Sequence, residues 1–253
     1  MNILLLNGSP KGDCSNTLKI AHAFMEGLNA NADKHIHIIN ISRSHIEPCN
    51  GCYSCWAITP GKCIINDDMT TDFLHQYKNA DIIIWSFPLY FYGMPSKIKG
   101  FLDRLVPLTL PEIKITASGR NRHPHRYDLL HQRHVLISTC GFSKIENNYD
   151  ALFKQFDSIF GKDSVCDRLT KIICPEGELF SIPQMSAKTD EYLANVTQAG
   201  KEFIQTGSFS DATQKKLNTL LFPAESFIEM ANTHWEAVIA GAQQAGTESH
   251  CKH

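Results

Sequence analysis

The chain lacks any apolar run near the ~20 residues that a membrane-spanning helix needs. It also lacks a surplus of charge, because 24 basic and 26 acidic side chains leave a formal net charge of −2. Such a balance provides no overall attraction to nucleic acid or to an anionic membrane surface. The apolar residues 3–6 follow no basic segment and end at Asn7, so they do not resemble a secretion signal. We therefore expect no nucleic-acid partner, no membrane partner and a cytoplasmic location.

Nine cysteines stand out against these absences. Without a secretion signal they are expected in a reducing compartment, as thiols or metal ligands rather than as a disulfide framework. A hydrophobic content of 43% and a charged content of 20% are ordinary for a globular protein. The length of 253 residues allows one large domain or two small ones, with a core that needs no disulfides.

Apolar segments of two kinds alternate along the chain. Five short runs are continuously apolar, as are strands buried on both faces of a parallel sheet: residues 2–6, 35–41, 80–85, 135–139 and 168–174. Segments with helical spacing lie between and after them, at residues 15–28, 67–78, 95–105, 151–160 and 187–204. This alternation predicts a doubly wound α/β fold, and five strands fit the flavodoxin-like order 2-1-3-4-5.

Residues 206–213 form a polar stretch with glycine and serine, which predicts a linker. We divide the chain there into a flavodoxin-like domain of residues 1–205 and a C-terminal helical extension and tail of residues 206–253. Helical spacing returns over residues 214–241, with Pro223 as an expected break. The apolar residues of this extension suit packing on the same domain or on a partner subunit, and we expect a homo-oligomer, specifically a dimer. Residues 243–253 are expected to fray.

The first predicted strand and helix are joined by a loop of small and hydroxylated residues. It matches neither G-x-x-x-x-G-K-[ST] nor G-x-G-x-x-G, two common phosphate-binding patterns. Ser9, Ser15 and Thr17 nevertheless flank a helix start, where unpaired N–H groups and the helix dipole favour an anion. The same residues also suit a plain β–α turn in which Ser15 or Asn16 caps the helix.

Two later loops follow the carboxyl ends of the third and fourth predicted strands, the edge at which open α/β sheets bind ligands. After the third strand, three aromatic residues at 90–92 lie between Pro88 and Gly93. This loop is too apolar for a solvated connection and suits the edge or face of a flat aromatic ring. Residues 139–142 leave the fourth strand at the same edge. The aromatic residues would alternatively cap the hydrophobic core.

Three motifs in this order resemble the flavodoxin-like NAD(P)H-dependent FMN reductase family: Asn7-Gly8-Ser9-Pro10 with Ser15-Asn16-Thr17, then Pro88-Leu89-Tyr90, then Lys99-x-x-x-Asp103-Arg104. The resemblance covers roughly residues 1–205 and implies an FMN cofactor, with NAD(P)H as co-substrate. It implies a phosphate site of Ser9, Lys11, Ser15, Asn16 and Thr17, and an isoalloxazine site of Pro88, Leu89, Tyr90, Phe91, Tyr92, Gly93, Thr139, Cys140, Gly141 and Phe142. The family often has arginine in place of Lys11, which supplies a charge but no bidentate fork.

Four cysteines form a C-x2-C-x2-C-x7-C run: Cys49, Cys52, Cys55 and Cys63. Three interpretations remain open. A [4Fe–4S] cluster needs four thiolates, commonly three from a tight C-x2-C-x2-C turn, and this spacing resembles the iron–sulfur flavoproteins of the same flavin family. Structural zinc usually uses two separated C-x2-C pairs, which one crowded run fits less well. The third interpretation is a set of plain or redox-active thiols beside the flavin.

The resemblance implies a flavin oxidoreductase that receives hydride from reduced nicotinamide and passes electrons to an acceptor, a small molecule or a protein. The chemistry would belong to FMN, so no catalytic side chain is expected from the protein. The alternatives are an iron–sulfur flavoprotein that carries electrons between protein partners and a flavin- or redox-sensing module without turnover. Lys99, Asp103 and Arg104 are expected to form structural ion pairs.

Overall fold

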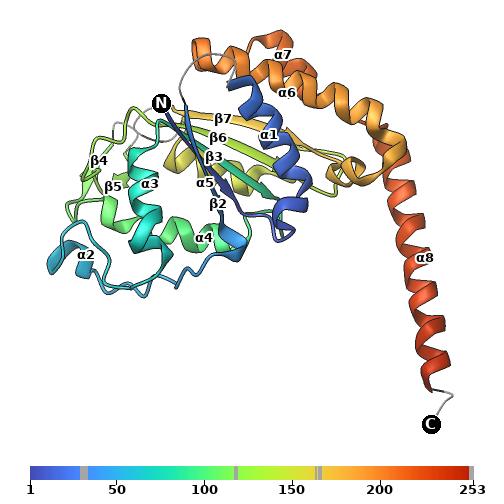
Figure 1. Ribbon diagram of the computed structural model, residues 1–253, viewed down its shortest axis with the longest axis horizontal. Coiled ribbons are helices and arrows are strands. Elements are labelled where there is room, and N and C mark those ends of the chain that lie inside the picture. The colour runs from blue at the N-terminus through green and yellow to red at the C-terminus, as the bar shows by residue number, and fades with distance from the viewer. Residues whose placement is uncertain (29–33, 117–118, 163, 165–166, 251–253) are drawn as a thin grey trace.

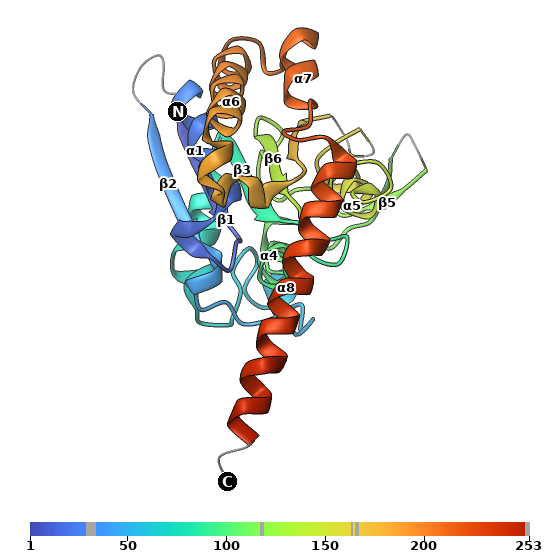
Figure 2. The same ribbon diagram turned by 90° about the vertical axis from the view of Figure 1, so that its right-hand side faces the viewer.

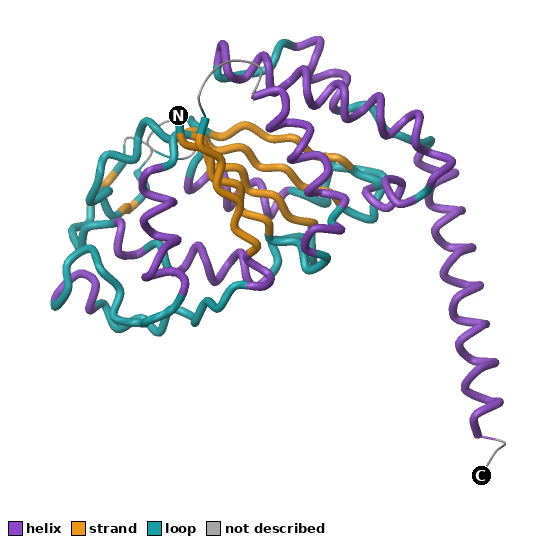
Figure 3. Tube along the Cα trace, viewed as in Figure 1, coloured by secondary structure: helices purple, strands orange, loops and turns teal. Residues whose placement is uncertain are grey.

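Five parallel strands form the central sheet in the computed structural model, which describes residues 1–28, 34–116, 119–162, 164 and 167–250, with 243–250 described by their backbone alone. The strands are β1 (Asn2–Asn7), β2 (His35–Asn40), β3 (Ile82–Pro88), β6 (Arg133–Thr139) and β7 (Leu169–Cys174). They lie in the order β2-β1-β3-β6-β7, and all neighbours are parallel. The predicted strand order is confirmed, and Figure 3 shows the strands as one twisted layer.

Helices cover both faces of this sheet (Figure 1). They are α1 (Asn16–Leu28) and α6 (Ser186–Thr206) on one face, and α3 (Leu74–Asn79), α4 (Ser96–Asp103) and α5 (Asp150–Ile159) on the other. In β1, Ile3 and Leu5 belong to the first core, whereas Leu4 and Leu6 belong to the second. Successive strand residues point to opposite faces, so continuous apolar runs supply both cores.

The helix boundaries predicted within residues 1–205 hold to within a few residues, with one difference of kind. The helix expected over residues 67–78 opens with a π-helical segment, Met69–Phe73, before α3 begins. Asp67 marks this start, because its carboxylate accepts the Met69 N–H at 3.1 Å. Three short elements were not predicted from the sequence: α2 (Ser54–Ala57) and the two strands of a hairpin, β4 (Lys114–Ile115) and β5 (Asn121–Arg122).

The linker predicted over residues 206–213 is a tight connection between two helices. Gly207 ends α6 with a φ of 79°, and α7 (Asp211–Leu217) begins behind Ser210, whose Oγ accepts the Thr213 N–H at 3.2 Å. Gly207 and Ser210 are therefore helix caps. Leu217 and the following Leu221 and Phe227 are buried in the core on the α1/α6 face, so the extension begins as part of the same hydrophobic core.

The last helix, α8 (Ala224–His250), is the longest helix among the described residues and runs away from the body in both views (Figures 1 and 2). Its backbone is helical to His250, where fraying was expected, and residues 251–253 lie outside the described residues. Its exposed side chains include Trp235, which is 60% exposed. No helix in the described parts of the chain combines the length and the apolar character needed to cross a membrane.

Candidate functional site

The loops after β1, β3 and β6 meet at the carboxyl edge of the sheet around a hollow of ≈ 100 Å³. The predicted residues that line it are Ser9, Lys11, Ser15, Asn16, Thr17, Pro88, Leu89, Tyr90, Thr139, Cys140 and Gly141. Gly177 and Glu178, from the turn after β7, complete the wall. The other predicted residues, Phe91, Tyr92, Gly93 and Phe142, are not part of this lining. The sheet topology therefore brings most of the predicted residues together.

The first loop turns tightly because Gly8 lies against α4. A Cβ on Gly8 would fall 2.3 Å from Ile98 Cγ1, so a larger residue does not fit. The Gly8 N–H donates to Ser86 O of β3 at 2.9 Å. Asn7 fastens the loop from within, since its amide donates to Gly12 O at 3.1 Å. The neighbouring elements thus hold the shape of the loop.

Two hydroxyl sites at the start of α1 have protons left to donate. Ser15 Oγ accepts the Leu18 N–H at 3.2 Å, so Ser15 caps the helix as predicted, yet its own proton stays available. The hydroxyls of Thr17 and Thr139 lie 2.6 Å apart and share one hydrogen bond, which leaves one of their two protons. Capping and anion binding are therefore compatible here, where the helix dipole favours negative charge.

Asn16 acts differently from the implied phosphate contact. Its Nδ2 donates to Gly177 O and to Ser181 Oγ, each at 2.9 Å. Both amide protons are engaged, so the side chain holds the 3-10 segment Gly177–Ser181 against the start of α1. A contact from Asn16 to a phosphate would come from its backbone N–H, which has no helical partner at this position.

Lys11 stands at the mouth of the hollow. Its Nζ lies 3.6 Å from Glu178 Oε2, and both side chains are more than half exposed. An exposed pair of this kind contributes about 0–1 kcal/mol, so the ammonium exchanges partners at little cost. Lys11 is placed to meet an anion in the hollow, and Glu178, which sequence analysis missed, competes for it.

Residues 90–93 form a tight turn that displays aromatic rings beside the hollow. Tyr90 and Gly93 exchange two backbone hydrogen bonds of 2.9 Å. Between them, Phe91 and Tyr92 have positive φ values of 46° and 62°, a conformation that is strained for bulky residues. The Phe91 ring is fully exposed, and the Tyr92 ring lies 6.0 Å from that of Phe142. The aromatic residues at 90–92 thus form an exposed platform and do not cap the core.

A fourth segment of this edge, residues 175–181 after β7, was not predicted from the sequence. Gly177 packs so closely that a Cβ would lie 2.7 Å from Thr139. The preceding Glu176 is completely buried, and burial raises the pKa of its carboxyl. The position of the segment directly after the fifth predicted strand was the signal for it, because parallel strands end at one edge.

The four cysteines of the C-x2-C-x2-C-x7-C run lie in the long connection between β2 and α3. Cys49 and Cys52 are exposed, Cys63 is half-buried and Cys55 is buried. Among the described residues, no three side chains of cysteine, histidine, aspartate or glutamate are placed to hold a metal ion. The donor set suits a cluster chemically, but the cluster and zinc interpretations both require residues 48–64 to rearrange.

The sulfurs are nevertheless close enough to affect one another. Burial raises the pKa of the Cys55 thiol, and the charges of Cys63, Cys52 and Cys49 raise it further. Hydrogen bonds with Ser54 lower the pKa of Cys52. Because Cys52 is also exposed, it is suited to react as a thiolate.

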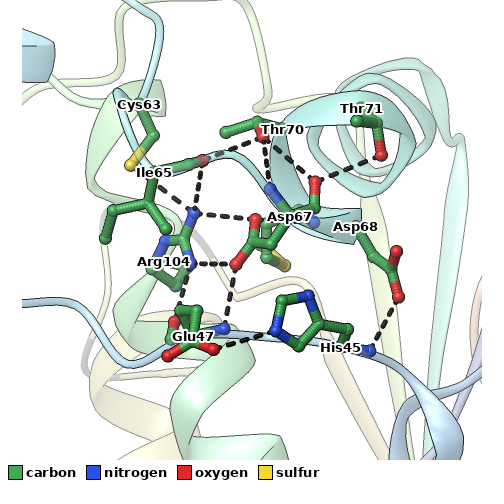
Figure 4. Close-up of polar contacts among 10 residues, drawn as sticks. His45, Glu47, Cys63, Ile65, Asp67, Asp68, Thr70, Thr71 and Arg104 are labelled. Carbon is green, nitrogen blue, oxygen red and sulfur yellow. Dashed lines mark hydrogen bonds and ion pairs between the residues drawn. The ribbon is translucent and has the colours of Figure 1, made fainter.

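A buried ion pair joins the two ends of residues 48–64, the cysteine loop (Figure 4). Arg104 is 1% exposed, and its guanidinium donates to both carboxylate oxygens of Asp67. It also donates to Glu47 O at 2.6 Å, before the first cysteine, and to Ile65 O and Cys63 Sγ at 3.5 Å, at the last one. Asp67 accepts the Glu47 N–H at 2.9 Å. Both ends of the loop are thereby fastened to the end of α4.

These contacts confirm the structural ion pairs expected for the Lys99-x-x-x-Asp103-Arg104 motif. Lys99 Nζ lies 2.6 Å from Asp103 Oδ1 on the exposed face of α4. Burial pushes the pKa of the Asp67 carboxyl up, but hydrogen bonds from Arg104 and from backbone N–H groups outweigh it and hold that pKa below its usual range. The buried pair is therefore ionised at neutral pH.

The cysteine loop packs on the segment around the β4–β5 hairpin. The ring of Trp56 lies 4.7 Å from the ring of His123. Gly61 has a φ of 82°, and a Cβ there would lie 2.6 Å from Tyr127 Oη. Figure 1 shows α2, β4 and β5 at the end of the molecule opposite α8. Within the described structure, none of the four cysteines lines the hollow, so the placement gives no support to thiols beside a flavin.

Comparison with known proteins agrees with this architecture. Residues 1–162 match the family model described as Flavodoxin-like fold. The chain belongs to this family. An iron–sulfur flavoprotein of Methanocaldococcus jannaschii is 35% identical over 112 residues, which cover 44% of this chain and 54% of that protein. The flavodoxin-like chain thus spans about half the length of this curated relative.

Two solved structures share the flavodoxin-like fold. An NAD(P)H:quinone oxidoreductase from Methanothermobacter marburgensis superposes with a TM-score of 0.58 and 16% identity, over 80% of this chain and 96% of that one. An FMN-dependent NADH-azoreductase from Bacillus anthracis, in complex with FMN, gives a TM-score of 0.57 and 16% identity, over 81% and 100%. At this level of identity the likeness establishes the fold alone.

Proposed function

We propose that the chain is an oxidoreductase that binds FMN at the carboxyl edge of the sheet and passes electrons from NAD(P)H to an acceptor. The observation that carries the proposal is the meeting of hydroxyl donors at the start of α1 with the exposed aromatic turn at 90–93. The NAD(P)H and FMN chemistry named for the two structural neighbours supports the same activity.

The residues of the chain bind and orient the cofactor, while bound FMN supplies the hydride and electron transfer. A hollow of ≈ 100 Å³ is smaller than typical ligand pockets, so we assign it to the phosphate end. Ser9, Ser15 and the Thr17–Thr139 pair surround that end, and Lys11 supplies a positive charge. The aromatic residues at 90–92 and Phe142 would pack against the ring and shield it from water.

The test is a flavin titration of the full chain, followed by reduction without oxygen. We expect FMN fluorescence to be quenched on binding, and the absorbance of the bound flavin to bleach when NADH or NADPH is added. Turnover with quinone, azo and nitroaromatic acceptors then identifies the acceptor class. A chain that does not bind FMN would contradict the proposal. A bound flavin that NAD(P)H does not reduce would favour the sensing module.

A second candidate function is that of an iron–sulfur flavoprotein that carries electrons between protein partners. The four thiols of the cysteine loop and the name of the Methanocaldococcus relative favour it. Protein purified and reconstituted without oxygen would contain about four irons per chain, and Cys52→Ser would lose most of them. The exposed Cys14, outside the loop, provides the matched control Cys14→Ser, which should keep its iron. Reconstituted protein without iron would rule this candidate out.

We propose further that the chain is a homodimer formed through α8. Apolar residues recur at positions 228, 231, 235, 238 and 242, a seven-residue repeat typical of paired helices. Ile228, Trp235 and Val238 of this repeat are all more than two-fifths exposed. These five apolar positions form a stripe along one side of the helix, and Glu229 and Glu236 lie outside it at helical spacing. Two copies of α8 would therefore pair without bringing these charges together. A cytoplasmic location, where cysteines stay reduced, completes the proposal.

A further inference from the structure

Glu176 is a buried acid with no part in the proposed flavin chemistry. It follows β7, is 0% exposed, and adopts the left-handed conformation with a φ of 59°. Both features are costly, because non-glycine residues rarely have positive φ and a buried carboxyl loses its hydration. Its Oε1 has no hydrogen-bond partner among the described residues. Costs of this kind persist only where the surrounding structure compensates for them.

The backbone at Glu176 fixes the wall of the hollow. Its N–H donates to Phe142 O at 2.8 Å, and the following Gly177 N–H donates to Cys140 O at 2.8 Å. Gly177 O in turn accepts the Asn16 amide at 2.9 Å. The turn at Glu176 thereby ties the loop after β6 to the start of α1, two of the segments that meet at the hollow.

The side chain of Glu176 holds a different part of the molecule. Its Oε2 accepts the Phe222 N–H at 2.9 Å, and Phe222 lies two residues before α8. The Phe222 ring packs against the core on the α1/α6 face and lies 5.7 Å from Lys188 Nζ of α6. One carboxylate oxygen therefore fastens the segment that leads into α8. Residues 176 and 222 both lie beyond the matched residues 1–162.

We propose that Glu176 is a positioning residue that couples the C-terminal extension to the flavin site. The segment at 219–228 and the loop at 140–142 take up their positions together because one residue bonds to both. The inference rests on the proposed FMN site. Coupling between two sites is reciprocal, so bound FMN must order the segment as much as the ordered segment favours FMN.

Hydrogen–deuterium exchange of the full chain, with and without FMN, tests the coupling. In the wild type, FMN should slow exchange at residues 140–142 and also at residues 219–228. Glu176→Ala should lose the effect at 219–228 and bind FMN at least about fivefold more weakly, the lower end of typical coupling between sites. Glu176→Gln keeps an oxygen that accepts the Phe222 N–H and should retain both properties. The exposed Glu191→Ala of α6 is the matched control.

Each outcome decides the inference. If FMN binds to the wild type without slowing exchange at 219–228, the coupling does not exist, whether or not the alanine variant folds. If Glu176→Ala retains wild-type affinity and protection, the inference is overturned as well. If the wild type binds no FMN, the proposed function fails, and the coupling is then tested by hydrogen–deuterium exchange without ligand. Glu176→Ala must then speed exchange at both 140–142 and 219–228, and an effect at 219–228 alone would overturn it.

Discussion

Single hydroxyl groups at the start of α1 serve the helix and the proposed ligand at once. Ser15 Oγ accepts the Leu18 N–H, which satisfies one of the unpaired donors of the first turn. A hydroxyl accepts and donates simultaneously, so this bond leaves the Ser15 proton for an anion. Thr17 and Thr139 likewise share one hydrogen bond, which leaves one of their two hydroxyl protons for an anion. Small hydroxylated residues are therefore suited to a loop that must cap a helix and bind phosphate.

Removing these hydroxyls should weaken FMN binding. A hydrogen bond to a charged group contributes ~1.5–3 kcal/mol, so Ser15→Ala and Thr17→Ala should each raise the FMN dissociation constant by about tenfold or more. Ser15→Ala should also lower stability by about 1 kcal/mol through loss of the cap. Fluorescence titration measures the affinity. Riboflavin, which has no phosphate, is the control ligand, and its binding should change much less. An unchanged FMN dissociation constant would show that these hydroxyls do not contact the phosphate.

His134 makes the stability of the fold depend on pH. It is 1% exposed and its Nδ1 accepts the Trp85 Nε1–H at 3.2 Å. Burial, with the charge of Arg168, holds the pKa of His134 well below its usual value of 6.5. The folded chain keeps this ring neutral, whereas the unfolded chain takes up a proton below pH ~6.5. Stability should therefore decrease as the pH falls below ~6.5, by up to ~1.4 kcal/mol per pH unit for this residue.

Denaturant unfolding between pH 7.5 and 5 measures this dependence. His134→Gln cannot be protonated, so its stability should fall less steeply with decreasing pH than that of the wild type. The exposed His75→Gln should follow the wild-type slope. Equal slopes for the wild type and His134→Gln would show that His134 is protonated in the folded state.

At the scale of elements, the turn at 90–93 combines strain with exposure. Both central residues, Phe91 and Tyr92, have positive φ, which a type I′ hairpin turn requires and which Asn-Gly satisfies best. Exposed aromatic rings in such a turn lower stability without filling the core. This combination is typical of sites where a surface is kept for a ligand rather than for folding.

Replacing the turn with its preferred sequence should separate stability from binding. The double variant Phe91→Asn, Tyr92→Gly should raise the free energy of unfolding by about 1 kcal/mol or more, because it relieves the backbone strain. It should also weaken FMN binding, because the rings are gone. The double alanine variant removes the rings but keeps the positive φ, so it should weaken binding without the gain in stability. Chemical denaturation and flavin titration give the two quantities, and a destabilised Asn-Gly variant would argue against strain.

The cysteine loop depends on one buried ion pair at its base. Arg104→Ala leaves the Asp67 carboxylate buried without its partner, which should cost ~3–5 kcal/mol and expose residues 48–64 to proteolysis. On the same helix, Lys99→Ala breaks the exposed pair with Asp103 and should cost no more than ~1 kcal/mol. Urea unfolding and limited proteolysis provide the measurements. If the two variants lost equal free energy of unfolding, the buried Arg104–Asp67 pair would not be what holds the cysteine loop.

At the scale of the whole molecule, α8 is unusual because it leaves the body (Figure 2). Its 27 residues extend over ~40 Å. Helices in proteins owe most of their stability to packing of an apolar face, and the exposed apolar residues of α8 provide such a face that no other described part of the chain covers. A second copy of the helix would cover it.

A charge in this apolar stripe should therefore separate the subunits. Light scattering should give a dimer for the wild type, twice the chain mass of 28.4 kDa, and a monomer for Trp235→Glu. Glu236→Gln, on the next residue but away from the stripe, should remain dimeric. Circular dichroism should show less helix in the monomeric variant, since α8 loses its packing. A monomeric wild type would refute the α8 dimer, and a dimeric Trp235→Glu would place the interface elsewhere.

The extent of sequence-based prediction differs between the sheet and the site. The strands were readable because runs such as Ile82–Ile84 are apolar on both faces, a local pattern. Three loops of the site followed from the rule that parallel strands end at one edge. The roles of Asn16 and Glu178 did not follow, because each depends on a partner more than 150 residues away. The place of Glu176 did not follow either, because no motif specifies the conformation of its turn.

The sequence by itself determined the strand order, the two cores and the loop segments at the carboxyl edge, because periodicity and loop composition are local properties that topology rules extend to the whole sheet. Only the tertiary structure decided which side chains meet. It joined Arg104 to both ends of the cysteine loop, buried Cys55 while leaving Cys49 and Cys52 exposed, and bonded Glu176 to both the hollow and the C-terminal extension. Such pairings depend on how distant segments pack, and the same amino-acid pattern is compatible with several of them until the core is assembled.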